Sequence, residues 1–145
     1  TRTFSKAWGL AGLRVGWGAG PRELVARIAA LRPPFRVAAL SEHAAVAALA
    51  CDASWVAEHV RKVVALRERF AQALAASGFA PLPSQANFVL IPVRDAPAAA
   101  AALAERGVRV RPFTALAGIG DALRVSIASW PAMERVLGAL AEVRP

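Results

Sequence analysis

The sequence is poor in several residue types, and each shortage excludes a class of protein. Its single cysteine, Cys51, excludes an intramolecular disulfide framework and a cysteine-based zinc site. No apolar run approaches the ~20 residues that a membrane-spanning helix needs, so no membrane partner is expected. Tyrosine is absent, and aromatic residues make up 7% of the chain. The two histidines, His43 and His59, have no cysteine or acidic partner at ligand spacing, so no metal site is predicted.

What remains is a chain of 145 residues that is 57% apolar, enough for the packed core of one ordinary domain or of a piece of a larger one. The net charge of +8 raises the question of nucleic-acid binding. The basic residues are scattered, however, and form no block of like charge and no recognition motif. Nucleic acid is therefore not an expected partner.

Glycine and proline divide the first half of the chain into elements. Alternation predicts a short strand over Leu13–Trp17. A helix is expected from Pro21 to Leu31, before two prolines, and a second from about Ala39, with Ser41 or a neighbour as its cap and Val46 and Leu49 on one face. A long amphipathic helix follows from Asp52 to Ser77–Gly78, and its charged residues are expected on a solvated face: Arg61, Lys62, Arg67, Glu68 and Arg69.

After Gly78 the pattern changes to short strands alternating with helices. Strands are predicted over Phe88–Ile91, Val108–Arg111 and Leu123–Ile127. Helices are predicted over Ala96–Arg106 and after Ser129, which is expected to be a cap. This order predicts an α/β fold in which helices pack on one face of a mainly antiparallel sheet.

Lysine is rare, which makes the position of one lysine informative. Lys6 and Lys62 are the two lysines of the chain. A buried lysine can lose its proton and become a nucleophilic amine, whereas arginine stays protonated. Thr3, Ser5 and Arg14 flank Lys6, and hydroxyls with a guanidinium can bind a phosphate dianion. An amine beside a phosphate site suits an enzyme that uses pyridoxal phosphate; the alternative is an ordinary surface lysine in a loop.

A lysine motif and four further segments occur in order along the whole chain. The motif is TFSK at residues 3–6 followed by GLAGLRVG at residues 9–16. The further segments are RPPF at 32–35, ANF at 86–88, VRP at 110–112 and LRVS at 123–126. In these segments the sequence resembles the fold-type I, class I and II aminotransferases, most closely their histidinol-phosphate aminotransferase branch.

The resemblance implies an architecture and a setting. Residues 1–50 would be the C-terminal end of the large cofactor-binding domain, and residues 51–145 the small C-terminal domain. The expected protein is a cytoplasmic homodimer that acts on small amino-acid and keto-acid substrates. Such enzymes are much longer, so Thr1 is expected to be a truncation point, with the phosphate loop, the aromatic residue on the cofactor ring and the aspartate at its nitrogen preceding it.

The resemblance also implies a role for each matching residue. Lys6 would form the Schiff base with pyridoxal phosphate and move the proton during transfer. Thr3, Ser5 and Arg14 would bind the cofactor phosphate. On the substrate side, Arg124 would bind the α-carboxylate, Arg111 would help to bind a substrate phosphate, and Asn87 would face the site. For Arg111 and Asn87 the alternative is a local structural role at a strand end.

Three departures from the family pattern bear on the substrate more than on the reaction. Trp8 and Trp17 stand where the family often has phenylalanine or tyrosine, Arg36 replaces a usual asparagine, and residues 127–129 replace a glycine-containing turn. Transfer between histidinol phosphate, or a similar amine, and 2-oxoglutarate is the expected reaction. A lyase like threonine-phosphate decarboxylase and a catalytically inert truncated domain are the alternatives.

Overall fold

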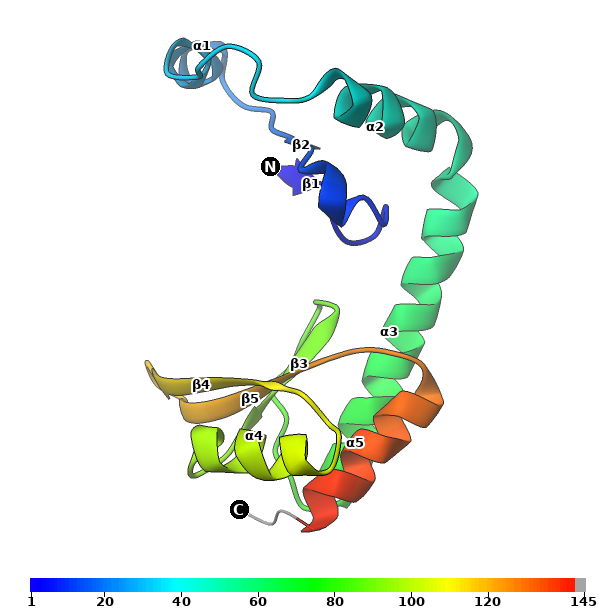
Figure 1. The fold of residues 1–145 in the computed structure, drawn as a ribbon, viewed down its shortest axis with the longest axis vertical. Helices are drawn as coiled ribbons and strands as arrows, with labels where there is room; N and C mark the ends of the chain where they lie inside the picture. Colours follow the sequence, from blue (N-terminus) through cyan, green and yellow to red (C-terminus); the bar gives the residue numbers. More distant parts are fainter. Residues whose placement is uncertain (143–145) are drawn as a thin grey trace. The chain divides into compact units, whose positions relative to one another are not determined.

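The computed structural model describes residues 1–142 and contains two compact units, Thr1–Val60 and Arg61–Pro145. The boundary between the units falls within the longest helix, α3 (Figure 1). The domain boundary expected near residue 50 stays a prediction. In chain order the elements are β1 (Arg2–Thr3), the 3-10 turn η1 (Ala11–Leu13), β2 (Gly16–Trp17), α1 (Arg22–Ala30), α2 (Ala39–Cys51), α3 (Ala53–Ala76), β3 (Phe88–Pro92), α4 (Ala96–Glu105), β4 (Arg111–Leu116), β5 (Gly120–Ser126) and α5 (Trp130–Glu142).

The first unit begins with a two-stranded antiparallel ribbon. β1 pairs with β2 so that Thr3 lies opposite Gly16. The strand predicted over Leu13–Trp17 is wrong in its first half, because Leu13 belongs to η1 and Arg14 turns the chain in the left-handed region with φ of 52°. The ribbon needs glycine at position 16, since a Cβ there would lie 2.6 Å from the carbonyl oxygen of Arg2.

The two predicted helices of the first unit are present, but the face of α2 that carries Val46 and Leu49 is not the buried one. Ser41 is no cap: α2 begins two residues earlier, and Ser41 is buried within its first turn. The other buried residues of α2 are Ala45 and Ala48, while Val46 and Leu49 are exposed. None of the residues of α1 is buried. Within this unit the small side chains of α2 pack inward, because alanine allows close approach, and the larger apolar ones remain uncovered.

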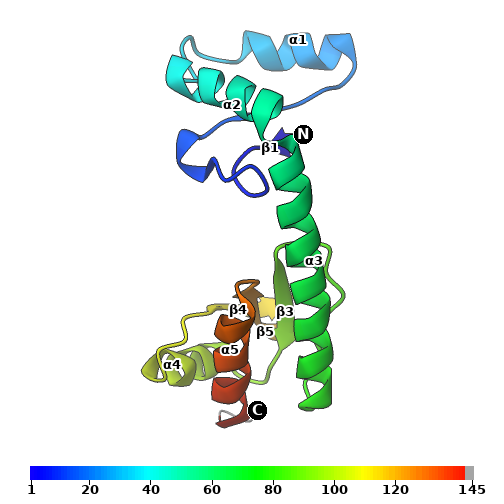
Figure 2. The same ribbon diagram turned by 90° about the vertical axis from the view of Figure 1, so that its right-hand side faces the viewer.

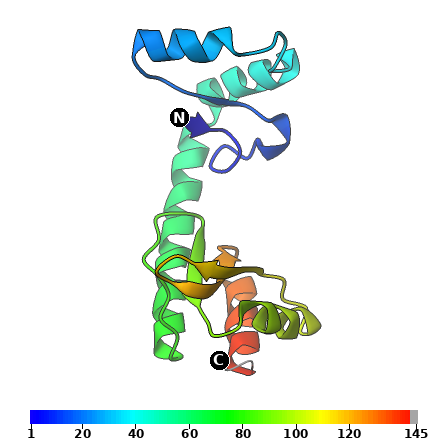
Figure 3. The same ribbon diagram turned by 90° about the vertical axis from the view of Figure 1, so that its left-hand side faces the viewer.

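The second unit is a three-stranded antiparallel sheet in the order β3-β5-β4 with helices against one face. Alternate residues of two adjacent strands, Val89 and Ile91 on β3 and Leu123 and Val125 on β5, point into the core. They meet Phe70 and Leu74 of α3, Leu103 of α4, and Met133, Val136 and Leu140 of α5. Figures 2 and 3 view the sheet from opposite sides, with α5 in front of it in one and behind it in the other. The predicted α/β fold is confirmed. The opposite face of the sheet, called the open face below, carries no helix from residues 61–142.

The last two strands differ from the sequence prediction in their bounds, and β5 begins at Gly120 instead of Leu123 and ends at Ser126 instead of Ile127. Val108–Val110 is not a strand, and β4 instead begins at Arg111 and continues through Pro112 to Leu116. The predicted strand ends at Arg111 because the next residue, Pro112, lacks an N–H. β4 is an edge strand, however, and an edge position leaves one side of the backbone without a partner, so proline is tolerated there.

The charged side of α3 is not wholly solvated, which corrects the sequence prediction. Arg67 donates a hydrogen bond of 3.1 Å from Nη1 to the carbonyl oxygen of Ala86, in the loop before β3. The guanidinium of Arg69 stacks on Trp130 of α5, with Cζ 3.4 Å from the ring centroid. These two arginines therefore join α3 to the elements that follow it.

No helix within residues 1–142 combines the length and the apolar character that crossing a membrane would require.

Asp121 joins α4 to the end of β4. Its Oδ2 accepts a hydrogen bond of 3.0 Å from the N–H of Ala96, the first residue of α4. Its Oδ1 accepts one of 3.1 Å from the N–H of Ala115, where the register of β4 shifts. These two N–H donors, Ala96 first, hold the pKa of Asp121 below its ordinary value of 3.8.

Replacing Gly16 with alanine is expected to destabilise the first unit. The added Cβ cannot be accommodated without moving the backbone of Arg2, so the free energy of unfolding should fall by about 1–3 kcal/mol. Gly12→Ala is the matched control, because no atom lies within 4 Å of a Cβ at that position. Urea unfolding of both variants measures the difference; equal stabilities would contradict the close approach at Gly16.

Asp121→Asn is expected to lower stability in a pH-dependent way. Because the pKa of Asp121 is depressed by folding, its carboxylate stabilises the protein above pH 3.8, and this contribution is lost as the pH falls through the lower pKa of the folded state. The difference in stability between the variant and the wild type should therefore be greatest at neutral pH and should disappear in acid. Thermal unfolding across that range measures it, with Asp52→Asn as the control. A difference that persists unchanged in acid would contradict this role.

Candidate functional site

The loop that carries Lys6 is a compact turn after β1. The hydroxyl of Thr3 donates to the Ser5 hydroxyl at 2.9 Å, and the N–H of Ser5 donates back to Thr3 Oγ1 at 3.0 Å. The N–H of Gly9 donates to the carbonyl oxygen of Lys6 at 3.0 Å, and Gly9 has φ of 70°, which closes the turn. Phe4 is buried between these residues and anchors the loop. The two hydroxyls are thereby held together, and the residue that follows Ser5 carries a primary amine.

Lys6 itself is exposed, and in residues 1–142 its amine has no hydrogen-bond or ion-pair partner. The first unit alone therefore does not bury the amine of Lys6. Arg14 is also exposed and lies just before β2, where Val15 accepts a hydrogen bond from the N–H of Phe4 at 3.2 Å. Arg14 uses Nη1 to hold the carbonyl oxygen of Ala11 at 2.8 Å. The structure thus places Thr3, Ser5, Lys6 and Arg14 on two adjoining segments.

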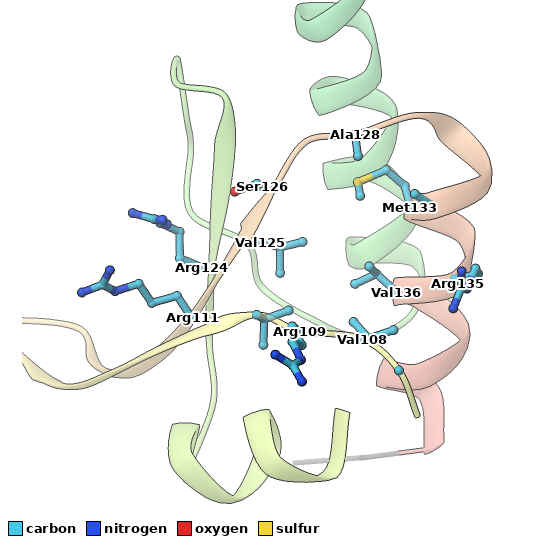
Figure 4. Close-up of a pocket in the computed structure, with 13 residues that line it drawn as sticks. Val108, Arg109, Arg111, Arg124, Val125, Ser126, Ala128, Met133, Arg135 and Val136 are labelled. Carbon is cyan, nitrogen blue, oxygen red and sulfur yellow. The ribbon is translucent and has the colours of Figure 1, made fainter. Parts of the chain in front are cut away.

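The arginines predicted on the substrate side are direct neighbours in the second unit. Arg111 of β4 lies opposite Arg124 of β5, and Arg124 also lies opposite Leu90 of β3. Directly opposed residues of an antiparallel pair project from the same face. Figure 4 shows both arginine side chains extending together on the side away from α5. Two guanidinium groups therefore share the open face of the sheet.

No carboxylate within residues 1–142 forms an ion pair with either arginine. Like charges that face each other across a ladder are destabilising, so an unneutralised pair is an unusual feature of a sheet. Nε of Arg124 is buried and lacks a hydrogen-bond partner among the described residues. A buried donor without a partner costs stability unless a ligand or another group satisfies it. The pair therefore has the character of an anion site.

Asn87 lies at the entrance to β3, where the backbone is held from two sides. Its carbonyl oxygen accepts a hydrogen bond of 2.9 Å from the N–H of Ile127, and its side chain is exposed. Ser84 donates from Oγ to the carbonyl oxygen of Phe88 at 2.6 Å. Ser84 and Arg67 therefore position the loop that carries Asn87. Neither Ser84 nor Arg67 was predicted as a site residue. The one local feature that could have pointed to Ser84 is its position three residues before Asn87.

A pocket of about 420 Å³ lies next to this region, and Arg111 and Arg124 are among the residues that line it, although their side chains extend away from its apolar part. Val108, Val125, Met133 and Val136 line its apolar part, between the segment before β4 and helix α5. In Figure 4 the side chains of Val125 and Val136 lie on the α5 side, whereas those of Arg111 and Arg124 extend away from it. Because the guanidinium groups carry the polar chemistry, the open face and not this pocket is the candidate anion site. Residues 1–142 contain no group of three or more metal-ligating side chains.

The chain matches known proteins along almost its whole length. Residues 1–140 match the family described as aminotransferase class I and II. Histidinol-phosphate aminotransferase 2 of Gluconobacter oxydans is 40% identical over 146 residues, which are 98% of this chain and 41% of that protein. The chain spans about two fifths of the length of the curated relatives it matches.

Solved structures with a similar fold also match almost the whole chain. Histidinol-phosphate aminotransferase from Sinorhizobium meliloti, in complex with pyridoxal-5'-phosphate, is 32% identical with a TM-score of 0.80, and the match covers 97% of this chain and 39% of that one. L-threonine-O-3-phosphate decarboxylase from Porphyromonas gingivalis is 25% identical with a TM-score of 0.84, over 97% of this chain and 45% of that one. The chain belongs to the class I and II aminotransferase family.

Proposed function

We propose that this chain supplies the catalytic lysine and the substrate-binding arginines of a pyridoxal-phosphate-dependent aminotransferase. The observation that carries the proposal is the turn over residues 3–6, in which Thr3 and Ser5 are hydrogen-bonded to each other and the next residue, Lys6, carries a primary amine. This set of groups suits a cofactor that presents both a phosphate and an aldehyde. The match of residues 1–140 to the family supports the same assignment.

The first unit would bind the cofactor. Thr3 and Ser5 would donate their hydroxyl protons to the cofactor phosphate, and Arg14 would add the charge of its guanidinium. When bound, pyridoxal phosphate supplies an aldehyde for the amino group and a ring that takes up the electrons released at the substrate Cα. Lys6 would bind the cofactor through Nζ, and Nζ would carry the proton that leaves Cα once the amino donor has displaced it. Parts of the protein outside this chain would enclose the exposed amine.

The second unit would bind the substrate. Arg124, with a buried Nε that has no partner, would bind the α-carboxylate in a bidentate fashion. Arg111, directly opposite, would bind a second anionic group, which favours a phosphorylated amino substrate such as histidinol phosphate, with 2-oxoglutarate as the acceptor. Asn87 would contribute its exposed amide. In this proposal the protein acts on small amino-acid and keto-acid substrates in the cytoplasm, in histidine biosynthesis, as a homodimer.

A second candidate is a lyase that acts on a phosphorylated amino acid, because L-threonine-O-3-phosphate decarboxylase has a similar fold over nearly the whole chain. The same lysine, hydroxyls and arginines would serve either reaction. Product assays separate the two: the aminotransferase converts 2-oxoglutarate to glutamate, whereas the lyase releases carbon dioxide from phosphothreonine. An inert domain would do neither.

Lys6→Ala in the full-length protein is expected to abolish the visible absorbance of lysine-bound cofactor. It should also lower the rate of transamination by roughly 10²- to 10⁴-fold or more, because no other group would move the proton. Lys62→Ala is the matched control, since it removes the other lysine of this chain and should leave the spectrum intact. Unchanged absorbance in Lys6→Ala would refute the role of Lys6.

Arg124→Lys is expected to weaken binding of 2-oxoglutarate by about 10- to 100-fold, because lysine keeps the charge but loses the two-pronged geometry. Arg111→Lys should instead discriminate between substrates, weakening a phosphorylated amine far more than an unphosphorylated aromatic amino acid. Dissociation constants from calorimetry measure both effects. Equal losses for the two amines would contradict the assignment of Arg111 to the phosphate.

A further inference from the structure

Each arginine of the pair has an aromatic ring within cation–π distance. Cζ of Arg124 lies 5.2 Å from the ring centroid of Phe88, and Cζ of Arg111 lies 5.5 Å from that of Phe113. Phe88 is the diagonal neighbour of Arg124, because Phe88 pairs with Ser126, two residues further along β5. Phe113 follows Arg111 by two residues on β4 and so projects from the same face. Both rings therefore belong to the open face of the sheet.

A ring and a carboxylate hold a guanidinium in different ways. A carboxylate would neutralise the charge and occupy the N–H donors that an anionic substrate needs. An aromatic face attracts the cation through its quadrupole and leaves the donors at the edge of the guanidinium plane available. Nε of Arg124 is indeed without a partner in the described part of the chain, and no acid pairs with either arginine there. The rings also lower the cost of placing two like charges opposite each other.

Phe88 is held more firmly than its counterpart. Its carbonyl oxygen accepts the 2.6 Å hydrogen bond from Ser84, and the next residue, Val89, is buried in the core. Phe113 lies on the edge strand, immediately before the shift in register that ends at Leu116. Phe88 can therefore fix the position of a neighbouring side chain, because its own backbone has little freedom.

We propose that Phe88 is a positioning residue for substrate recognition: its ring orients the Arg124 guanidinium and keeps its hydrogen-bond donors free for an anion. This inference rests on the proposed function, in which Arg124 binds the α-carboxylate. Phe88 acts through Arg124 and touches no reacting atom. Loss of the ring should weaken carboxylate binding without removing the charge that provides it.

The test compares four variants of the full-length holoenzyme by calorimetric titration with 2-oxoglutarate. Phe88→Leu should raise the dissociation constant roughly 3- to 30-fold, while Phe88→Tyr, which keeps the ring, should stay near the wild type. Phe79→Leu is the matched control, because Phe79 packs against the core and has no cation–π contact with either arginine of the pair. The fourth variant carries a fluorinated phenylalanine at position 88, which preserves the shape and reduces the negative charge of the ring face. It should bind more weakly than the wild type even if Phe88→Leu fails to fold.

The outcomes separate this inference from the function it depends on. If the wild type binds 2-oxoglutarate and either Phe88→Leu or the fluorinated variant binds it equally well, the positioning role is overturned and the proposed function stands. Equal losses in Phe88→Leu and Phe88→Tyr would also overturn it, because they would indicate packing and not the ring. A wild type with no affinity for 2-oxoglutarate would overturn both.

Discussion

The chemistry proposed for this chain requires cationic side chains that stay free of intramolecular partners. A lysine amine paired with a carboxylate could not react, and an arginine paired with one could not bind a substrate anion. In residues 1–142 the side chains of Lys6, Arg111 and Arg124 form no ion pair. Backbone pairing brings them to their positions instead, through the turn that closes at Gly9 and the ladders that join β5 to β3 and β4.

This arrangement explains why the strands of the second unit carry two kinds of residue. Leu123 and Val125 point to the helices and form the core, whereas Arg124 between them must point to the opposite face. A shift of one residue in the pairing would expose the core residues and bury the arginine. The core therefore fixes the position of the arginine, and Asp121 fixes the end of the same strand by binding the first N–H of α4. Stability and recognition depend on a single register.

Much of this fold could be predicted from local sequence patterns. The ends of α3 and α4 follow from glycine after the helix, and Gly78 and Gly107 both have positive φ. The failures occur where tertiary context decides. The alternation of Val108–Arg111 could not show that Arg111 would be the first paired residue, nor that an edge position would admit Pro112. The sequence places Val46 and Leu49 on one face of α2, but the buried residues of this helix are Ser41, Ala45 and Ala48.

The residues of the candidate site could be predicted from the sequence, but their contacts and exposure could not. A motif identifies Lys6 and its flanking hydroxyls, but the hydrogen bonds between Thr3 and Ser5 and the exposure of Lys6 required coordinates. The contacts of Phe88 and Arg67 join residues that are distant in sequence and leave no local pattern.

The identity of the reactive lysine is the most direct test of the account. Borohydride reduction of the full-length protein in the presence of pyridoxal phosphate, followed by mass spectrometry of its peptides, would locate the covalently fixed cofactor. The account predicts the added mass on the peptide that contains Lys6. A label on the peptide with Lys62, or no labelled lysine in this chain, would contradict it.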